Sequence, residues 1–263
     1  MKKIHTSSFV KRVTKYSIPK PARAWARSRY QRWTNPNYVP AVGTVDFGDF
    51  RRLSPISKKF GAERGTILDR YYTEQFLAEH QGDVKGRVLE VGDNNYTIRY
   101  GGDRVSKSDV LHVEVGNPLA TIVADLTRAD DIPSDTFDCI IFTHTIQMIY
   151  DLRAAMYHLY RILKPGGVIL MATHGTSKVG RRSEKDSWCV YWRMTVDSAR
   201  CLFGEHFPTE NLNVQGYGNV LVAMAFLYGL AAEELTPEEL NTYDPDYQVL
   251  VAARGVKPEH PIT

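Results

Sequence analysis

Short apolar runs recur along the second half of the chain, and most are too continuous to be one face of a helix. Runs of this kind, rich in Val, Ile and Leu and bounded by polar or glycine residues, are typical of strands buried on both faces. We predict such strands at Arg87–Val91, Val110–Val115, Thr121–Ala124, Phe137–Thr143 and Val168–Thr173.

Segments with helical spacing lie between and before these runs. Tyr72, Phe76 and Leu77 share one face of a predicted helix that begins at the capping residue Asp69 and runs to about His80. Residues 150–163 have the same spacing, and Lys164-Pro165-Gly166-Gly167 is expected to end that helix with a turn. Alternating strands and helices predict an α/β fold, a mostly parallel sheet with helices on both faces.

The remaining third of the chain continues the alternation after a polar segment at 175–186. Helices are predicted at 199–207 and 220–232, and strands at 211–215 and 248–253. The apolar run Val220–Ala232 is the longest in the chain, yet it is too short to span a bilayer. We therefore expect it to be a buried helix of a globular domain.

Basic residues concentrate at the N-terminus. Residues 1–33 contain ten Lys or Arg and no Asp or Glu, whereas the rest of the chain carries 23 basic and 30 acidic side chains, a balance of −7. This predicts a basic arm over residues 1–45, followed by one domain over 46–263. A short helix is possible at Ala22–Trp33, beyond Pro19 and Pro21.

Aromatic residues among basic ones give the arm two possible uses. Trp25, Tyr30 and Trp33 suit an anionic membrane surface or an acidic protein partner. The alternative is an arm that packs on its own domain or has no fixed structure. Three cysteines without paired spacing, and no secretory signal, favour a reducing compartment. We expect a cytoplasmic protein, with peripheral membrane contact through the arm as an option.

Polar residues follow the predicted strands at the edge where a parallel sheet binds its ligands. Glu114 lies 22 residues beyond Gly92, about the spacing at which an acid binds ribose hydroxyls. Asp125, after the third strand, could meet an adenine amino group. The set consists of Glu90, Gly92, Asp93, Glu114, Asp125, Thr143, His144 and His174.

The first loop, in "VLEVGDNNYTIRYGG", departs from a dinucleotide site. Gly92 stands alone where a glycine-rich phosphate loop is needed, and the charge of Asp93 would repel a phosphate. A nicotinamide-dependent oxidoreductase is therefore disfavoured. Only about twenty residues join the first two strands, so a long first helix hardly fits. A cationic ligand without phosphate is compatible with Asp93, which could bind an ammonium group.

The order of these segments resembles the class I S-adenosylmethionine-dependent methyltransferases. The matching stretches are "GRVLEVG", "VLHVEV", "ADLTRADDIPSDTFDCIIFTHTIQMIYD" and "YRILKPGGVILMATHG". The approach "RLSPISKKFGAERGTILDRYY" is similar to type 11-like bacterial members associated with glycan and natural-product pathways. The resemblance implies a Rossmann-like fold with a seven-stranded, mostly parallel sheet, an antiparallel C-terminal strand and S-adenosylmethionine as cofactor.

The resemblance also implies roles by position. Glu90 and Gly92 would frame the methionine end of the cofactor, Glu114 would bind ribose, and Asp125 with Leu126 would flank adenine. Thr143 and His144 would face the methionyl group or the acceptor. An N-terminal lid over about 46–82 would contribute the side chains of Arg70, Tyr71 and Tyr72.

Methyl transfer to a hydroxyl benefits from a base, and histidine titrates near neutral pH. His174 is the preferred candidate because it opens the polar and aromatic segment that would form the acceptor pocket, and His144 is the second. Arg181, Arg182, Asp186, Trp188, Tyr191 and Trp192 in that segment suit a saccharide or related hydroxylated acceptor. The spacing of carboxylates and histidines indicates no metal site.

Three alternatives to this O-methyltransferase remain. The missing glycines fit a non-catalytic methyltransferase-like domain that docks to a biosynthetic partner or membrane. The acids at several strand ends count against it, because a docking domain does not need them. The nicotinamide enzyme is disfavoured by its missing fingerprint. A nucleic-acid methyltransferase would need a broad basic surface, whereas the body of this chain is acidic, so no nucleic acid partner is expected.

Overall fold

The computed structural model describes residues 22, 23, 26, 30, 31, 34, 35, 38–180 and 189–260. The chain divides into two compact units, Met1–Arg52 and Leu53–Thr263, so the break falls seven residues beyond the predicted end of the arm. In the first unit, Ala22, Arg23 and Ala26 are helical, as are Tyr30 and Gln31. The arm residues Trp25 and Trp33 lie outside the described part of the chain, as do Arg181, Arg182, Asp186 and Trp188.

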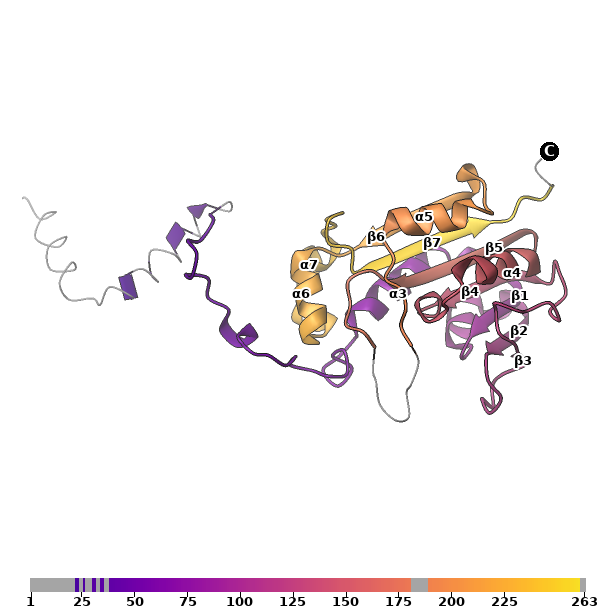
Figure 1. The fold of residues 1–263 in the computed structure, drawn as a ribbon, viewed down its shortest axis with the longest axis horizontal. Coiled ribbons are helices and arrows are strands. Elements are labelled where there is room, and N and C mark those ends of the chain that lie inside the picture. Colours follow the sequence, from indigo (N-terminus) through magenta and orange to yellow (C-terminus); the bar gives the residue numbers. More distant parts are fainter. Residues whose placement is uncertain are drawn as a thin grey trace, which may run out of the picture. The chain divides into compact units, whose positions relative to one another are not determined.

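The second unit is built on one seven-stranded sheet with the order β3-β2-β1-β4-β5-β7-β6 (Figure 1). β1 to β5 are mutually parallel, and β7 runs antiparallel to both β5 and β6. This confirms the predicted fold class, including its antiparallel C-terminal strand. The strands are β1 (Gly86–Val91), β2 (Val105–His112), β3 (Ile122–Val123), β4 (Phe137–Thr143), β5 (Leu163–His174), β6 (Leu212–Tyr217) and β7 (Leu250–Val256).

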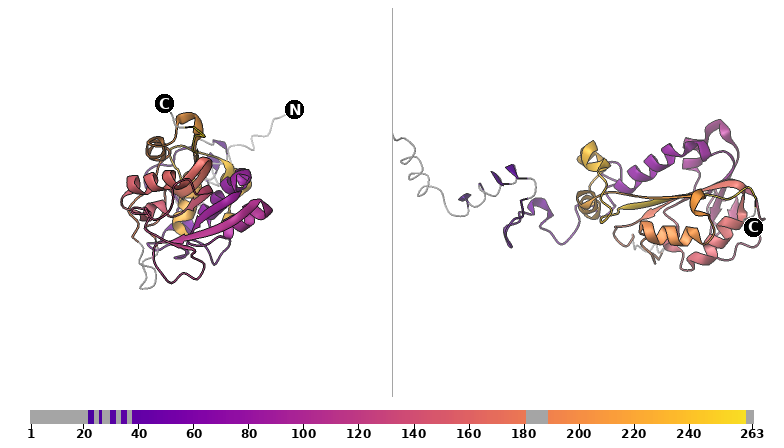
Figure 2. Two further views of the ribbon diagram at one scale, coloured as in Figure 1. Left: turned by 90° about the vertical axis from the view of Figure 1, so that its right-hand side faces the viewer. Right: turned by 90° about the horizontal axis from the view of Figure 1, so that it is seen from above.

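Helices cover both faces of the sheet, because its central strands present apolar side chains in both directions. The helices are α3 (Leu68–Glu79), α4 (Leu152–Ile162), α5 (Val196–Gly204), α6 (Val220–Tyr228) and α7 (Pro237–Asn241). Single 3₁₀ turns occur at Gly48–Phe50, Gln81–Asp83, Gly102–Arg104, Ile146–Met148, Thr209–Asn211 and Ala232–Glu234. Figure 2 shows α3 (purple) and α5 (orange) on opposite sides of the sheet.

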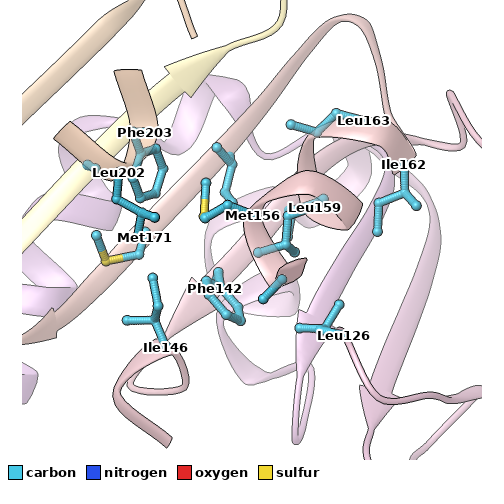
Figure 3. Close-up of a cluster of buried hydrophobic side chains, with 14 of the residues drawn as sticks. Leu126, Phe142, Ile146, Met156, Leu159, Ile162, Leu163, Met171, Leu202 and Phe203 are labelled. Carbon is cyan, nitrogen blue, oxygen red and sulfur yellow. The ribbon is translucent and has the colours of Figure 1, made fainter. Parts of the chain in front are cut away.

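One face carries α4 and α5. Phe142 and Met171 from the central strands pack there against Met156, Leu159 and Phe203, all of them fully buried (Figure 3). The other face carries α3 and α6, with a second core that includes Leu68, Phe76, Leu170, Ala252 and Phe226. Two cores of this size anchor the strands whose ends carry the polar residues.

Two strand boundaries differ from the sequence prediction for local reasons. β2 begins at Val105 and ends at His112, so Glu114 lies beyond the strand. β5 begins at Leu163 rather than Val168. Phe137 pairs with Leu163 while Cys139 pairs with Val168, so the Lys-Pro-Gly-Gly stretch bulges out of the ladder instead of standing between helix and strand.

Two helix predictions also need correction. Ile67, not Asp69, is the N-cap of α3, and it makes no side-chain capping bond. The carboxylate of Asp69, the second residue of the helix, is directed to another partner. α6 ends at Tyr228, where Gly229 adopts a left-handed φ of 73°. Its outer residues Val220 and Leu227 are 47% and 43% exposed, so α6 is only half buried. Of the helices in the described part of the chain, none has the length and apolar character needed to cross a bilayer.

Replacing Phe142 by Ala should lower the free energy of unfolding by about 3–5 kcal/mol, because the ring is fully buried between β4 and two helices. Urea denaturation of the full chain measures this loss. Leu119→Ala is the matched control, since its side chain is 52% exposed in a loop and should change stability by less than about 0.5 kcal/mol. Equal effects of the two substitutions would contradict the placement of the core.

Candidate active site

A cavity of about 930 Å³ opens at the carboxyl ends of β1, β3 and β4 and is walled on one side by α3. Parallel sheets place their ligands at this edge, because the strand order changes direction there. Of the predicted site residues, Glu90, Gly92, Asp93, Asp125, Leu126, Thr143 and His144 line the cavity. The sequence had also indicated Arg70 and Tyr191, which line it too.

The loop after β1 turns sharply at Gly92, whose φ of +90° disfavours any residue with a side chain. A Cβ added there would meet nothing within 4 Å, so backbone conformation and not crowding requires the glycine. Asn117 fixes the turn by donating to the Gly92 carbonyl at 2.6 Å. Asp93 accepts from the Asn95 N–H at 3.0 Å, which leaves its carboxylate at the cavity wall.

A five-residue π-helix at Thr97–Gly101 and a 3₁₀ turn at Gly102–Arg104 are the helical segments between β1 and β2, which confirms that the short connection holds no long helix. Glu90 holds the start of the π-helix. The Glu90 side chain accepts from the Tyr96 N–H at 3.2 Å and from the Thr97 N–H and hydroxyl, each at 2.7 Å. Anionic groups are favoured at such helix starts, because the N–H groups there point outward.

Glu90 is 2% exposed. Burial raises the pKa of its carboxyl to about 7, although the hydrogen bonds from Thr97 and Tyr96 oppose the rise. The nearby charge of Asp93 adds to it. Glu90 therefore changes charge close to neutral pH, unlike an exposed glutamate.

Arg70 and Glu74 of α3 contact two residues of the first loop, Tyr96 and Arg99, that the sequence did not single out. Arg70 donates to the Tyr96 hydroxyl at 3.0 Å, and Arg99 forms an ion pair with Glu74 at 2.8 Å. All four side chains line the cavity. No motif links α3 to the first loop, so only the fold could bring these residues together.

Asp125 and Leu126 occupy the expected position after β3. One Asp125 oxygen accepts from the N–H and the hydroxyl of Thr127, both at 2.9 Å, which orients the carboxylate. Leu126 is 4% exposed and belongs to the α4–α5 core while also lining the cavity. An apolar side chain beside an oriented acceptor suits a planar ring that carries an amino group.

Glu114, Tyr71 and Tyr72 are not among the cavity-lining residues. Glu114 is exposed, two residues past the end of β2, and its carbonyl and N–H lie 2.8 and 3.2 Å from His112 Nδ1. His112 occupies the strand end and lines the cavity instead. Tyr72 is a core residue that donates to the Leu240 carbonyl at 2.7 Å. The cofactor roles of these three residues stay predictions that the geometry does not favour.

The two candidate bases meet on one acid. His174 Nε2 lies 2.6 Å from Asp69 Oδ2, and His144 Nδ1 lies 3.9 Å from the same oxygen. Thr73 Oγ1 is 2.9 Å from His144 Nε2 and donates to the Asp69 carbonyl at 2.7 Å. Asp69 does not cap α3 because its carboxylate contacts His174 in this cluster. Of Asp69, His144 and His174, only His144 lines the cavity.

Burial controls the charge of this cluster. His144 is shielded from water, and desolvation lowers the pKa of its imidazole to about 3, so the ring is neutral at physiological pH. Burial also opposes ionisation of Asp69, but the attraction of His144 and the hydrogen bond with His174 outweigh it and lower its pKa to about 2. Because the His144 ring is neutral, the short hydrogen bond with His174 is the main interaction that keeps Asp69 ionised.

His144 also has an unusual backbone. Its φ of 47° lies in the left-handed region, which costs a residue with a side chain about 1–3 kcal/mol. The His144 N–H donates to the Ala172 carbonyl at 2.7 Å, so the end of β5 holds this conformation. Strain at this position turns the imidazole toward the cavity and Thr73.

An aromatic group lies on the far side of the cavity. Tyr150 and Tyr191 both line it, and their rings are 5.3 Å apart in an edge-on arrangement. Trp192 stacks beside Tyr150 at 5.9 Å and donates to the Ile149 carbonyl at 2.9 Å. Tyr150 and Tyr191 are 71% and 50% exposed, so their faces are available to a ring-shaped molecule.

The raised pKa of Glu90 predicts a pH-dependent stability. Below its ordinary pKa of 4.5 both folded and unfolded chains are protonated, and the favourable contribution is complete. As the pH rises towards about 7 the unfolded chain loses this proton first, so the contribution is lost. At about 1.4 kcal/mol per pKa unit, the loss is about 3 kcal/mol at most.

Glu90→Gln removes this titration. The difference in unfolding free energy between wild type and Glu90→Gln should therefore be about 3 kcal/mol larger at pH 4 than at pH 8. Urea denaturation of both proteins at the two pH values measures it. A difference that does not change with pH would show that Glu90 has an ordinary pKa.

A family model described as a methyltransferase domain matches residues 60–215, more than half of the chain. The Ubiquinone/menaquinone biosynthesis C-methyltransferase UbiE of Marinomonas sp. (strain MWYL1) is 31% identical over 87 residues, 33% of this chain and 32% of that protein. The UbiE of Enterobacter sp. (strain 638) is 31% identical over 122 residues, 42% of this chain and 43% of that protein. The chain thus spans about a third to two fifths of the length of these relatives.

A crystal structure of an S-adenosylmethionine dependent methyltransferase from Mesorhizobium loti aligns at 14% identity, with a TM-score of 0.49, over 72% of this chain and 98% of that one. The family assignment does not depend on that alignment. It rests on the domain match, which includes β1 to β5 and the loops that form the cavity. The chain belongs to the class I S-adenosylmethionine-dependent methyltransferase family, and S-adenosylmethionine is the cofactor of that family.

Proposed function

We propose that this protein transfers a methyl group from S-adenosylmethionine to a hydroxyl of a saccharide or a related hydroxylated small molecule. The observation that carries the proposal is the convergence of Glu90, Asp93 and Asp125 on one cavity at the carboxyl ends of parallel strands. A non-catalytic docking domain has no need of three acidic side chains in one such cavity.

The residues fit this cofactor. S-adenosylmethionine carries an ammonium and a sulfonium and no phosphate, which matches acids in the first loop better than a dinucleotide would. A cavity of about 930 Å³ is within the range that holds a cofactor and a small acceptor together. Glu90, Gly92 and Asp93 would hold the methionine end, and Asp125 with Leu126 the adenine. When bound, the cofactor supplies a methyl group already activated on sulfur.

The chain then has to orient the acceptor and receive its proton. His144 is the histidine at the cavity wall. Thr73 Oγ1 lies 2.9 Å from its Nε2, so Nδ1, which has no hydrogen-bond partner among the described residues, is the nitrogen that would take the proton of an acceptor hydroxyl. Burial makes that ring a weak base, but the Asp69 carboxylate 3.9 Å away would stabilise the positive charge as the proton arrives. We therefore propose His144 as the base and His174 as a positioning residue, the reverse of the sequence-based preference.

A second acceptor class is supported by specific observations. The matched relatives are named as C-methyltransferases of ubiquinone and menaquinone biosynthesis. The exposed rings of Tyr150 and Tyr191 would stack on a quinol-type ring as well as on a sugar. The chain covers less than half of those relatives, so this remains the second candidate.

Asp93→Asn should weaken S-adenosylmethionine binding about tenfold, because the amide keeps the bond from Asn95 but loses the charge that faces the ammonium. Calorimetric titration measures the change. Glu114→Gln is the matched control and should bind normally, since Glu114 is exposed and outside the cavity lining. An unchanged affinity in Asp93→Asn would remove Asp93 from the site, and a loss in Glu114→Gln would restore the predicted ribose contact. Failure of the wild-type protein to bind S-adenosylmethionine would contradict the cofactor assignment.

Turnover tests the reaction itself. Mass spectrometry of mixtures with labelled S-adenosylmethionine should show methylated product from a panel of saccharides, with quinols as the second arm. His144→Ala should lower kcat about 100-fold or more while S-adenosylmethionine still binds. His80→Ala, a histidine on the outer end of α3, is the control. Full activity of His144→Ala would exclude it as the base, and product from quinols alone would favour the second acceptor class.

A further inference from the structure

The cluster beside the cavity contains atoms that the proposed reaction does not explain. In the described part of the chain, four buried side-chain atoms lack a hydrogen-bond partner, and two of them, Asp69 Oδ1 and His144 Nδ1, belong to this cluster. Buried polar groups are normally paired, so two orphaned atoms in one cluster need an explanation.

Both orphaned atoms are of the kind that binds metal ions, a carboxylate oxygen and an imidazole nitrogen. The potential ligand atoms of Asp69, His144 and His174 all lie within 4.8 Å of one another. His144 Nδ1 and Asp69 Oδ2 are 3.9 Å apart, a separation that one ion can bridge with two bonds of about 2.0–2.2 Å. His174 Nε2 is closer to the same carboxylate, at 2.6 Å, and would move outward by a fraction of an ångström as a proton is replaced by a metal ion.

The donor set suits a first-row divalent metal ion. Two imidazoles and one carboxylate are the ligands of catalytic zinc sites, which keep a fourth position open. Thr73 Oγ1 donates to the Asp69 carbonyl and therefore accepts from His144 Nε2–H, which leaves Nδ1 as the His144 nitrogen that can bind a metal. His144 is the one of the three residues that also lines the cavity.

The surroundings hold the three ligands in place. Thr73 Oγ1 lies 2.9 Å from His144 Nε2, which is the kind of outer bond that fixes a ligating histidine. Phe60 and Phe226 flank the His174 ring, with centroids 6.5 and 6.0 Å away. An apolar wall of this kind limits water and strengthens binding of a charged ion to charged ligands.

We propose that Asp69, His144 and His174 form a binding site for one divalent zinc-class ion, at the inner end of the cofactor cavity. The three ligands come from α3, the loop after β4 and the last residue of β5, 105 residues apart at the extremes. Because the three residues lie far apart in the chain, they form no metal-ligand spacing motif, and the sequence therefore indicated no metal site. The proposal rests on the proposed function only for the neighbouring cavity, and an ion on His144 Nδ1 would take the place of the proton-accepting role proposed above for that ring.

Metal binding by the full chain tests the site without cofactor or acceptor. After dialysis against chelator, the protein is titrated with Zn²⁺ and separately with Co²⁺, whose visible absorption reports four- or five-coordinate nitrogen and oxygen ligands. We expect one ion per chain. Asp69→Asn, His144→Ala and His174→Ala should each weaken binding at least about 100-fold, because three ligands cannot be reduced to two without a large loss.

His80→Ala is the matched control, since His80 is the C-cap residue of the same helix and lies outside the cluster. Circular dichroism of each variant separates loss of a ligand from loss of the fold, and His144→Gln serves where His144→Ala does not fold. Zn²⁺ that binds wild type no more tightly than the ligand variants would overturn the proposal and leave a cluster that shares a proton. S-adenosylmethionine titration of the same samples keeps the two proposals apart, because cofactor binding without metal binding removes only the metal site.

Discussion

Glu90 is sealed beneath the first loop, and three hydrogen bonds fix its two carboxyl oxygens. Methyltransferases of this class usually close this region with glycines, which let backbone approach a ligand. Here one buried acid anchors the start of a short π-helix, and a single glycine makes the turn. The shape of the cavity floor depends on that bond set, because Tyr96, Arg70 and Asp93 are placed relative to it.

A carboxyl group in that position also makes the cavity responsive to charge. Burial raises the pKa of Glu90 to about 7, so a cationic ligand would favour its ionised form. At the other end of the cavity, burial acts in the opposite direction on His144 and keeps it neutral. Desolvation, which disfavours whichever form carries charge, therefore shifts the pKa values of both Glu90 and His144.

Sequence reasoning succeeded where the evidence is local. The apolar runs predicted Phe137–Thr143 to the residue and placed the other strands within a few positions, because buried parallel strands have a continuous pattern. It placed the end of β2 three residues too late, at Val115 instead of His112, so Glu114 lies beyond the strand and outside the cavity lining. It also assigned Asp69 to a helix cap, whereas the Asp69 carboxylate contacts His174. It also missed Arg99 and Tyr96, since nothing in their spacing relates them to α3.

The sequence by itself determined the fold class, the family and the edge of the sheet where chemistry occurs, because hydrophobic period and the order of strand ends are properties of neighbouring residues. The tertiary structure alone decided which residues share the cavity and what charge they carry. Asp69 and His174 meet across 105 residues, and the pKa values of Glu90 and His144 follow from burial. Proximity and desolvation arise only when distant segments pack together, and no local pattern records them.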